Sequence, residues 1–245
     1  MSFDRLAPHY RSLEVLLAGR VLQRAREAHL VALRGAREIL LLGEGPGRLL
    51  ETIVRSHIDA RITVVDSSQA MLDQAARHIG DAGQQVHWIH ADLREWSPPR
   101  AQYDAVATSC VLDCFDAPML ARLIPNWAAA LRPDATWLYV DFALPARGWR
   151  RYRARVIHAW MYVVFRRITA IEARAVPPPD RWLKEAGFRR RALAEFSAGL
   201  IRSEWWQRGR CTHSEIAEPA GRSANDAASS TVSSAALVTR VATPT

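Results

Sequence analysis

"ILLLGEGPGR" (Ile39–Arg48) is the stretch of sequence that decides the fold. Its apolar first half is typical of a buried strand, and its second half is a glycine-rich turn that leads into a helical pattern over 48–56. Glycine is needed where the backbone turns tightly, or where a ligand approaches it without a Cβ in the way. Gly43, Gly45 and Gly47 are therefore candidate binding residues, although strand-to-helix turns also use glycine for steric reasons alone.

The next strand pattern, over 61–65, ends at Asp66, 19 residues after Gly47. A carboxylate in this place can accept hydrogen bonds from both hydroxyls of a ribose, and the alternative is that it begins the following helix. Loop and carboxylate together predict an adenosine-containing cofactor at the carboxyl ends of the strands. A dinucleotide-binding loop usually has a third glycine where this chain has Leu50, which favours S-adenosylmethionine over NAD.

Strand and helix patterns alternate along most of the chain. This alternation predicts right-handed crossovers, and hence an α/β fold with a doubly wound, seven-stranded, mostly parallel sheet and helices on both faces. The expected strands are 38–42, 61–65, 85–90, 103–110, 136–142, 188–196 and 200–207. The expected helices are 8–33, 48–56, 68–79, 117–131, 147–171 and 180–186.

The composition is that of a globular protein. Of the 245 residues, 49% are hydrophobic and 24% are charged, which excludes a collagen-like or generally disordered chain. The longest strongly apolar runs are too short to cross a bilayer, and the first residues lack the apolar core of a secretory signal. Cys110, Cys114 and Cys211 show no metal-ligand spacing. We therefore expect a cytoplasmic protein without a metal.

The charge is strongly positive, but its source argues against a nucleic-acid binder. Of the 33 basic residues behind the net charge of +8, only Lys184 is a lysine, whereas nucleic-acid binders more often use both types. Residues 211–245 are rich in Ala, Ser and Thr, and we expect them to be a disordered tail. Residues 1–210 then form one domain.

Several ordered motifs resemble the class I S-adenosylmethionine-dependent methyltransferases, and the group most similar is the small-molecule, ubiquinone/menaquinone methyltransferase-like one. The resemblance covers roughly 3–208. The motifs are the glycine loop, "VVDSSQAML" (64–72), "HADLREW" (90–96), "YDAVATSCVLDCF" (103–115), "LRPDATWLYVDF" (131–142), "LKEAGFRR" (183–190) and the entry stretch "FDRLAPHY" (3–10). The resemblance implies a Rossmann-like fold and S-adenosylmethionine as the cofactor.

The resemblance also assigns roles to residues of this chain. It implies that the three glycines line the methionine and ribose part of the cofactor, and that Asp66 binds the ribose hydroxyls. Beyond these, Ser67 and Met71 are expected beside the adenine, Asp92 at its amino group, the Leu93 amide at a ring nitrogen, and Ser109 and Cys110 at the methionine.

The glycine loop departs from the family in one respect. The family usually has an acidic residue two positions before the first glycine, where this chain has Leu41, and Glu44 stands inside the loop. We infer two possibilities for Glu44: it neutralises the ammonium group of the cofactor in place of the missing acid, or it points to solvent.

On the substrate side the candidates are Asp113, Asp141 and Tyr10. Asp113 has a structural alternative, because it lies three residues before Asp116, the expected N-cap of the next helix. A base is required only if the methyl acceptor carries a proton. Residues 147–174 hold eight arginines among aromatic side chains. They are either a solvated basic helix or a cap that meets an anionic or membrane-held substrate.

These observations predict methyl transfer from S-adenosylmethionine to a small, hydrophobic or amphipathic molecule. The alternatives are a non-catalytic or RNA-associated cofactor-binding protein of the same fold and, less favoured, an NAD-type oxidoreductase.

Overall fold

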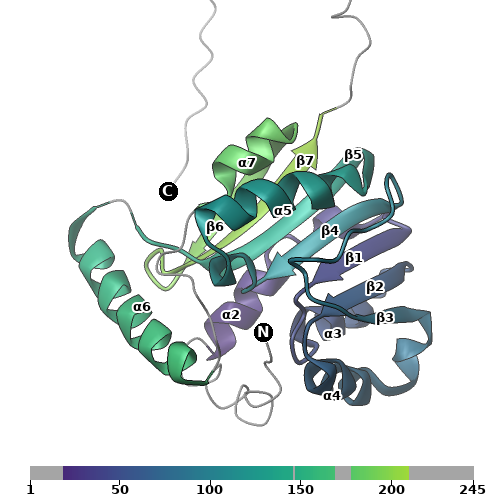
Figure 1. Cartoon of the computed structure of the whole chain (residues 1–245), viewed down its shortest axis with the longest axis horizontal. Helices are drawn as coiled ribbons and strands as arrows, with labels where there is room; N and C mark the ends of the chain where they lie inside the picture. Colours follow the sequence, from purple (N-terminus) through teal and green to yellow (C-terminus); the bar gives the residue numbers. More distant parts are fainter. Residues whose placement is uncertain (1–18, 146, 169–177, 210–245) are drawn as a thin grey trace, which may run out of the picture. The chain divides into compact units, whose positions relative to one another are not determined.

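A seven-stranded sheet organises this computed structural model, which describes residues 19–145, 147–168 and 178–209. The strand order is β3-β2-β1-β4-β5-β7-β6 (Figure 1). Five strands are parallel, namely β1 (Glu38–Leu42), β2 (Arg61–Asp66), β3 (Val86–His90), β4 (Tyr103–Ser109) and β5 (Leu131–Phe142). β6 (Phe188–Phe196) and β7 (Ile201–Arg208) are antiparallel additions at the β5 edge. The predicted doubly wound, mostly parallel sheet is confirmed.

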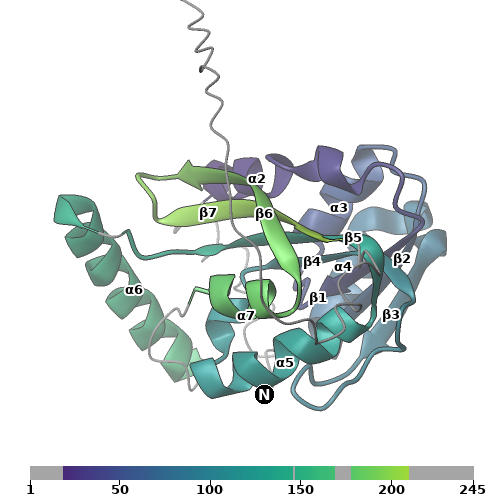
Figure 2. The ribbon, with the colours of Figure 1, turned by 90° about the horizontal axis from the view of Figure 1, so that it is seen from above.

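Helices cover both faces of the sheet, as Figure 2 shows from above. They are α2 (Gly19–Glu27), α3 (Arg48–Arg55), α4 (Gln69–Ile79), α5 (Ala117–Ala129), α6 (Gly148–Ile168) and α7 (Asp180–Glu185). One face packs residues of α3 and α4 against β1 and β2, and the other packs α5 and α7 around Trp127, Trp137 and Phe188. Because both faces are covered, the strand β1 is buried along its whole length.

Several local features follow from single residues. Ser68 begins α4 by accepting a hydrogen bond from the Met71 amide at 3.2 Å, and Asp116 begins α5 in the same way from Met119 at 2.9 Å. Gly187 follows the end of α7 in a left-handed conformation (φ +88°), as expected for a glycine just after a helix. These polar signals fix where the helices begin and end, and hence where the loops at the sheet edge lie.

Several boundaries differ from the sequence-based expectation. In the described part of the expected helix 8–33, α2 ends at Glu27 and a short 3₁₀ turn, Leu30–Leu33, follows. β5 begins at Leu131 rather than at residue 136, and the pairing of β4 and β5 shifts register between Tyr103 and Ala105. β4 ends at Ser109 rather than at residue 110, because Cys110 takes a left-handed conformation (φ +54°).

The predictions for Tyr10 and for the tail 211–245 lie outside the described residues, as does the part of the predicted cap beyond 168. The described residues all belong to one compact unit. Among them, no helix combines the length and apolar character that a bilayer-crossing segment needs.

Candidate active site

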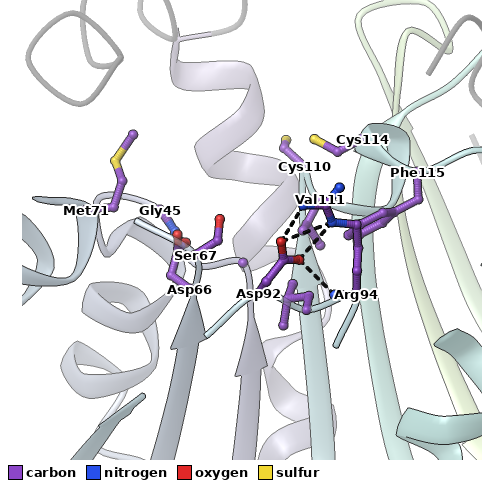
Figure 3. A pocket seen from close by; sticks show the side chains of 12 residues that line it. Gly45, Asp66, Ser67, Met71, Asp92, Arg94, Cys110, Val111, Cys114 and Phe115 are labelled. Atoms are coloured by element: carbon purple, nitrogen blue, oxygen red, sulfur yellow. Dashed lines mark hydrogen bonds and ion pairs between the residues drawn. The ribbon is translucent and has the colours of Figure 1, made fainter. Parts of the chain in front are cut away.

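A cleft opens at the carboxyl ends of β1, β2 and β4, beside the point where the strand order reverses between β1 and β4 (Figure 3). Open α/β sheets bind their ligands at such a point. The cleft holds about 640 Å³ of empty space when its open mouth is included. It is lined by Gly43, Gly45, Asp66, Ser67, Met71, Asp92, Leu93, Arg94, Cys110, Val111, Cys114 and Phe115.

Asp66 joins the end of β2 to the glycine loop. One carboxylate oxygen accepts a hydrogen bond from the Gly45 amide at 2.9 Å, and the other accepts one from the Ser68 amide at 2.9 Å. Burial raises the pKa of Asp66, and these backbone donors act in the opposite direction. A carboxylate has about four acceptor sites. Asp66 therefore orders the loop and keeps acceptor capacity for hydroxyl groups in the cleft.

The three loop glycines have three different reasons to be glycine. A Cβ on Gly43 would lie 2.2 Å from Val111 Cγ2, whereas a Cβ on Gly45 would meet no atom within 4 Å. A Cβ on Gly47 would lie 2.8 Å from the Ala75 Cβ and 2.9 Å from the Ala75 Cα of α4. Gly43 and Gly45 line the cleft, and their contact with the cofactor stays a prediction. Gly47 does not line it, and the structure gives Gly47 a packing role between α3 and α4 instead.

Glu44 neither points to solvent nor lines the cleft. It is buried, and its Oε1 accepts hydrogen bonds from the Leu49 amide at 2.7 Å and the Leu50 amide at 2.9 Å. The carboxyl group thus satisfies free N–H groups at the start of α3. Burial raises the pKa of Glu44 to about 7, against the lowering effect of the two amides and of Arg26. The expectation of a solvent-facing Glu44 is therefore corrected.

Arg26 is a functional candidate that the sequence analysis missed. It is buried on α2, and its Nε donates to Ser109 Oγ at 3.1 Å. Ser109, expected to face the methionine, is occupied by this bond and does not line the cleft. Arg26 also lies close enough to Glu44 to lower its pKa. No local motif marks Arg26, because its partner is 83 positions away.

Asp92 lines the cleft but forms an ion pair with Arg94. Its Oδ1 accepts from the Arg94 amide at 2.9 Å and from Arg94 Nε at 3.0 Å. These bonds, the side-chain one foremost, lower the pKa of Asp92 to about 2, so the carboxylate is ionised at any ordinary pH. Arg94 was also missed, although it follows Asp92 by two positions in the motif.

Asp113 and Asp141 form an acid pair next to the cleft, in which Asp141 is buried and Asp113 is half-buried. Asp141 accepts hydrogen bonds from the Asp113 amide at 3.2 Å and the Phe142 amide at 2.8 Å, and it is fully buried. Burial raises the pKa of Asp113 to about 6, and burial together with Asp113 holds the pKa of Asp141 well above its usual range. Neither residue lines the cleft. The pair anchors the short 3₁₀ turn Leu112–Cys114, whose Cys114 does line it.

The wall of the cleft that follows β4 is apolar. It consists of Cys110, Val111, Cys114 and Phe115, of which only Cys110 was predicted as a site residue. Cys114 donates from its thiol to Asp113 at 3.7 Å, and burial raises its pKa well above the usual range, so it stays a neutral thiol. In the described ranges, no group of three metal-ligating side chains comes together.

The residues present fit an adenosine-containing cofactor. Gly45 leaves open space beside the Asp66 carboxylate, Met71 offers an apolar surface, and Asp92 is an ionised acceptor. Leu50, which stands where a dinucleotide loop has its third glycine, is buried in the core with Leu41.

Comparison with known proteins agrees with this site. Residues 39–134 match the family model of the methyltransferase domain. The trans-aconitate 2-methyltransferase of Azoarcus sp. is 36% identical over 103 residues, which are 42% of this chain and 38% of that protein. The corresponding enzyme of Mycobacterium tuberculosis is 32% identical over 129 residues, 51% of this chain and 46% of that protein. The chain thus spans less than half the length of these relatives.

Solved structures share the fold. An O-methyltransferase family 2 protein from Planctomyces limnophilus, in complex with apigenin, has a TM-score of 0.65 and 18% identity, covering 84% of this chain and 62% of that one. The N-methyltransferase NodS from Bradyrhizobium japonicum, in complex with S-adenosyl-L-homocysteine, has a TM-score of 0.58 and 15% identity, covering 76% of this chain and 87% of that one.

The sequence match begins in β1, runs through the glycine loop and Asp66 to β5, and lies within a sheet of the strand order that places these residues around one cleft. Over these residues the chain is similar to a methyltransferase domain, and its sheet has the α/β fold of the solved methyltransferases.

Proposed function

We propose that this chain transfers a methyl group from S-adenosylmethionine to a small molecule. The observation that carries the proposal is the Asp66 carboxylate, held by the Gly45 and Ser68 amides at the mouth of a cleft where spare acceptor sites meet open space. The cofactor supplies a methyl group on a positively charged sulfur. The chain's own residues then have to bind the two reactants, align them and exclude water, since alignment is the main demand of an in-line displacement.

Each part of the cleft has a proposed role. Asp66 binds the ribose hydroxyls, Ser67 and Met71 lie beside the adenine, and Asp92 with the Leu93 amide accepts and donates at its edge. Arg26 and Glu44, both buried and close enough for Arg26 to lower the pKa of Glu44, lie near the methionine end. The location of Arg26 beside Ser109, at the end of β4, supports this assignment.

The acceptor molecule meets the apolar wall. Because Cys110, Val111, Cys114 and Phe115 offer few polar partners, we propose a hydrophobic or amphipathic acceptor. The relatives named as trans-aconitate methyltransferases make a small carboxylic acid the second candidate, and Arg94 is the cation in the cleft that such an acid would meet. A cytoplasmic location stays a prediction from the sequence.

The test is methyl transfer from labelled S-adenosylmethionine to trans-aconitate and to a panel of hydrophobic hydroxyl and amine compounds. Asp66→Ala should weaken S-adenosylhomocysteine binding by about 1.5–3 kcal/mol in calorimetry, since it removes partners from the ribose hydroxyls.

Asp104→Ala is the matched control for this variant. Asp104 likewise accepts from two backbone amides, Arg37 at 2.9 Å and Glu38 at 3.0 Å, but it lies at the opposite end of the sheet. It should lose stability and keep cofactor affinity. Cofactor binding without transfer to any compound would favour the non-catalytic alternative. Tighter binding of NAD than of S-adenosylhomocysteine would contradict the cofactor assignment.

A further inference from the structure

Three large side chains of α6 are exposed along one line of the helix. Trp149, Tyr152 and Val156 have exposed fractions of 65%, 73% and 52%. At about 100° per residue, positions 149, 152 and 156 fall within about 60° of one another around the helix axis. Exposed Trp and Tyr side chains that gather on one face do not contribute to packing on the sheet. The outer face formed by Trp149, Tyr152 and Val156 is therefore a candidate interaction surface.

The opposite side of α6 packs against the ends of β5 and β7. Ala154 is buried in a cluster with Val140, Phe142 and Ile201, and His158 packs edge-on against Phe142, with 6.0 Å between ring centroids. Arg153 ties the helix to the β6–β7 turn by donating to the Ser197 carbonyl at 2.7 Å. Ala154 and His158 point about 180° away from the outer face. The helix is thus anchored on one side, and its aromatic side is exposed.

The charge of this segment has one sign. No Asp or Glu occurs between Phe142 and Ile171, a stretch that holds seven arginines. In the described part, Arg147, Arg150 and Arg155 are exposed. Such a combination of interfacial aromatic residues and arginines fits the boundary between headgroups and acyl chains of an anionic bilayer, where Trp and Tyr are enriched and basic residues meet lipid phosphates.

We propose that the N-terminal half of α6 is a docking surface for an anionic lipid bilayer. Trp149, Tyr152 and Val156 enter the interface, and the three exposed arginines pair with anionic headgroups. The surface is connected to the cleft, because Cys110 of the cleft wall packs against the same cluster as Ala154. A docked α6 therefore holds the bilayer on the β5 side of the cleft, from which an amphipathic molecule can be delivered.

Vesicle flotation of the full chain tests the proposal. We expect binding to phosphatidylcholine vesicles that contain phosphatidylglycerol, release as KCl is raised, and weak binding to phosphatidylcholine alone. The triple variant Arg147→Gln, Arg150→Gln, Arg155→Gln should lose about five-fold in affinity for each arginine. The pair Trp149→Ser, Tyr152→Ser should bind at least ten-fold more weakly, and Trp149→Phe, Tyr152→Phe should restore binding.

The matched control lies on β6, where Arg189 and Arg191 are exposed beside Leu193. Arg189→Gln, Arg191→Gln, Leu193→Ser removes charge and apolar area of the same kinds and should leave vesicle binding within two-fold of wild type. Equal binding to both vesicle types, or an equal loss in the β6 control, would overturn the proposal. The proposal would also be overturned if the variant Trp149→Ser, Tyr152→Ser bound vesicles as tightly as wild type. The same holds if the arginines made the protein bind RNA more tightly than vesicles. Vesicle binding needs no methyl donor, so its failure leaves the proposed methyl transfer standing.

Discussion

The two walls of the cleft are built in different ways. On the β2 side the polar groups face the cleft, and they are ordered by backbone amides close in the sequence, as Gly45 and Ser68 order Asp66. On the β4 side the acids Asp113 and Asp141 stand behind the wall, and the surface itself is apolar. The difference teaches that one side is made for the hydroxyl-rich part of a nucleoside. The other side uses acidic side chains behind the wall to hold a turn in place by hydrogen bonds.

The largest effect separates packing from binding within the glycine loop. Gly47→Ala places a Cβ 2.8 Å from the Ala75 Cβ at a residue with φ +86°. Left-handed strain and overpacking together should lower the free energy of unfolding by about 2–5 kcal/mol. Gly45→Ala meets no atom within 4 Å, so it should cost only the strain of φ +62°, while it should weaken S-adenosylhomocysteine binding.

Urea denaturation and calorimetry on both variants measure this contrast. An equal loss of stability in the two would mean that α4 moves away from Gly47 at little cost. Unchanged cofactor affinity in Gly45→Ala would show that the loop does not contact the cofactor.

The second effect is the pH dependence that Glu44 gives to stability. Its pKa of about 7 in the folded protein is raised above the 4.5 of an ordinary glutamate. The folded state therefore holds a proton that the unfolded state has lost, and the stability from this proton is present below about pH 4.5 and lost as pH rises through 7. The loss amounts to about 3 kcal/mol.

Glu44→Gln keeps an Oε1 for both α3 amides, so its stability should lack this fall between pH 5 and pH 8. Thermal unfolding of both proteins across that range is the measurement. The same proteins test the cofactor role: if Glu44 neutralises the ammonium group, S-adenosylhomocysteine should bind wild type more tightly as pH passes 7. Identical pH profiles of affinity would leave Glu44 as a helix-capping residue.

These two tests also mark what the sequence could predict. The alternation of strands and helices, the glycine loop and Asp66 were accessible because each depends on a local pattern of apolar, glycine or acidic residues. The sequence did not reveal which glycine packs and which one faces the cleft, since that depends on Ala75 and Val111 across the fold. Arg26 is brought beside Ser109 by a contact between distant segments, and such a contact leaves no spacing to read. Cys114 and Phe115 stand in the motif 103–115, but a motif does not show which of its side chains face a cleft.

The third prediction concerns the acid pair on the β4 side. Asp141→Asn can accept from only one of the two amides that Asp141 now satisfies, because its NH₂ group would face an N–H donor. We expect a loss of about 1–3 kcal/mol in the free energy of unfolding. Cofactor affinity should stay within two-fold of wild type, since Asp141 does not line the cleft.

Denaturation and calorimetry of Asp141→Asn, with Asp113→Asn beside it, check this. A ten-fold loss of cofactor affinity with stability intact would show that the acids act in the cleft, and the contrast between the two walls would fail.

The smallest expected effect comes from the ion pair of Asp92 and Arg94, which lines the cleft. Asp92 and Arg94 are only partly buried, with 26% and 30% of their side chains exposed, so Arg94→Ala should change the free energy of unfolding by less than about 1 kcal/mol.

Removing Arg94 frees the Asp92 oxygens that it occupies. If Asp92 accepts from the adenine amino group, Arg94→Ala should bind S-adenosylhomocysteine at least as tightly as wild type, and Asp92→Ala more weakly. Because the pKa of Asp92 is about 2, this contribution should stay constant from pH 5 to pH 8, unlike that of Glu44. Calorimetry at several pH values separates the two carboxylates, and equal affinity of Asp92→Ala and wild type would assign Asp92 to the loop structure alone.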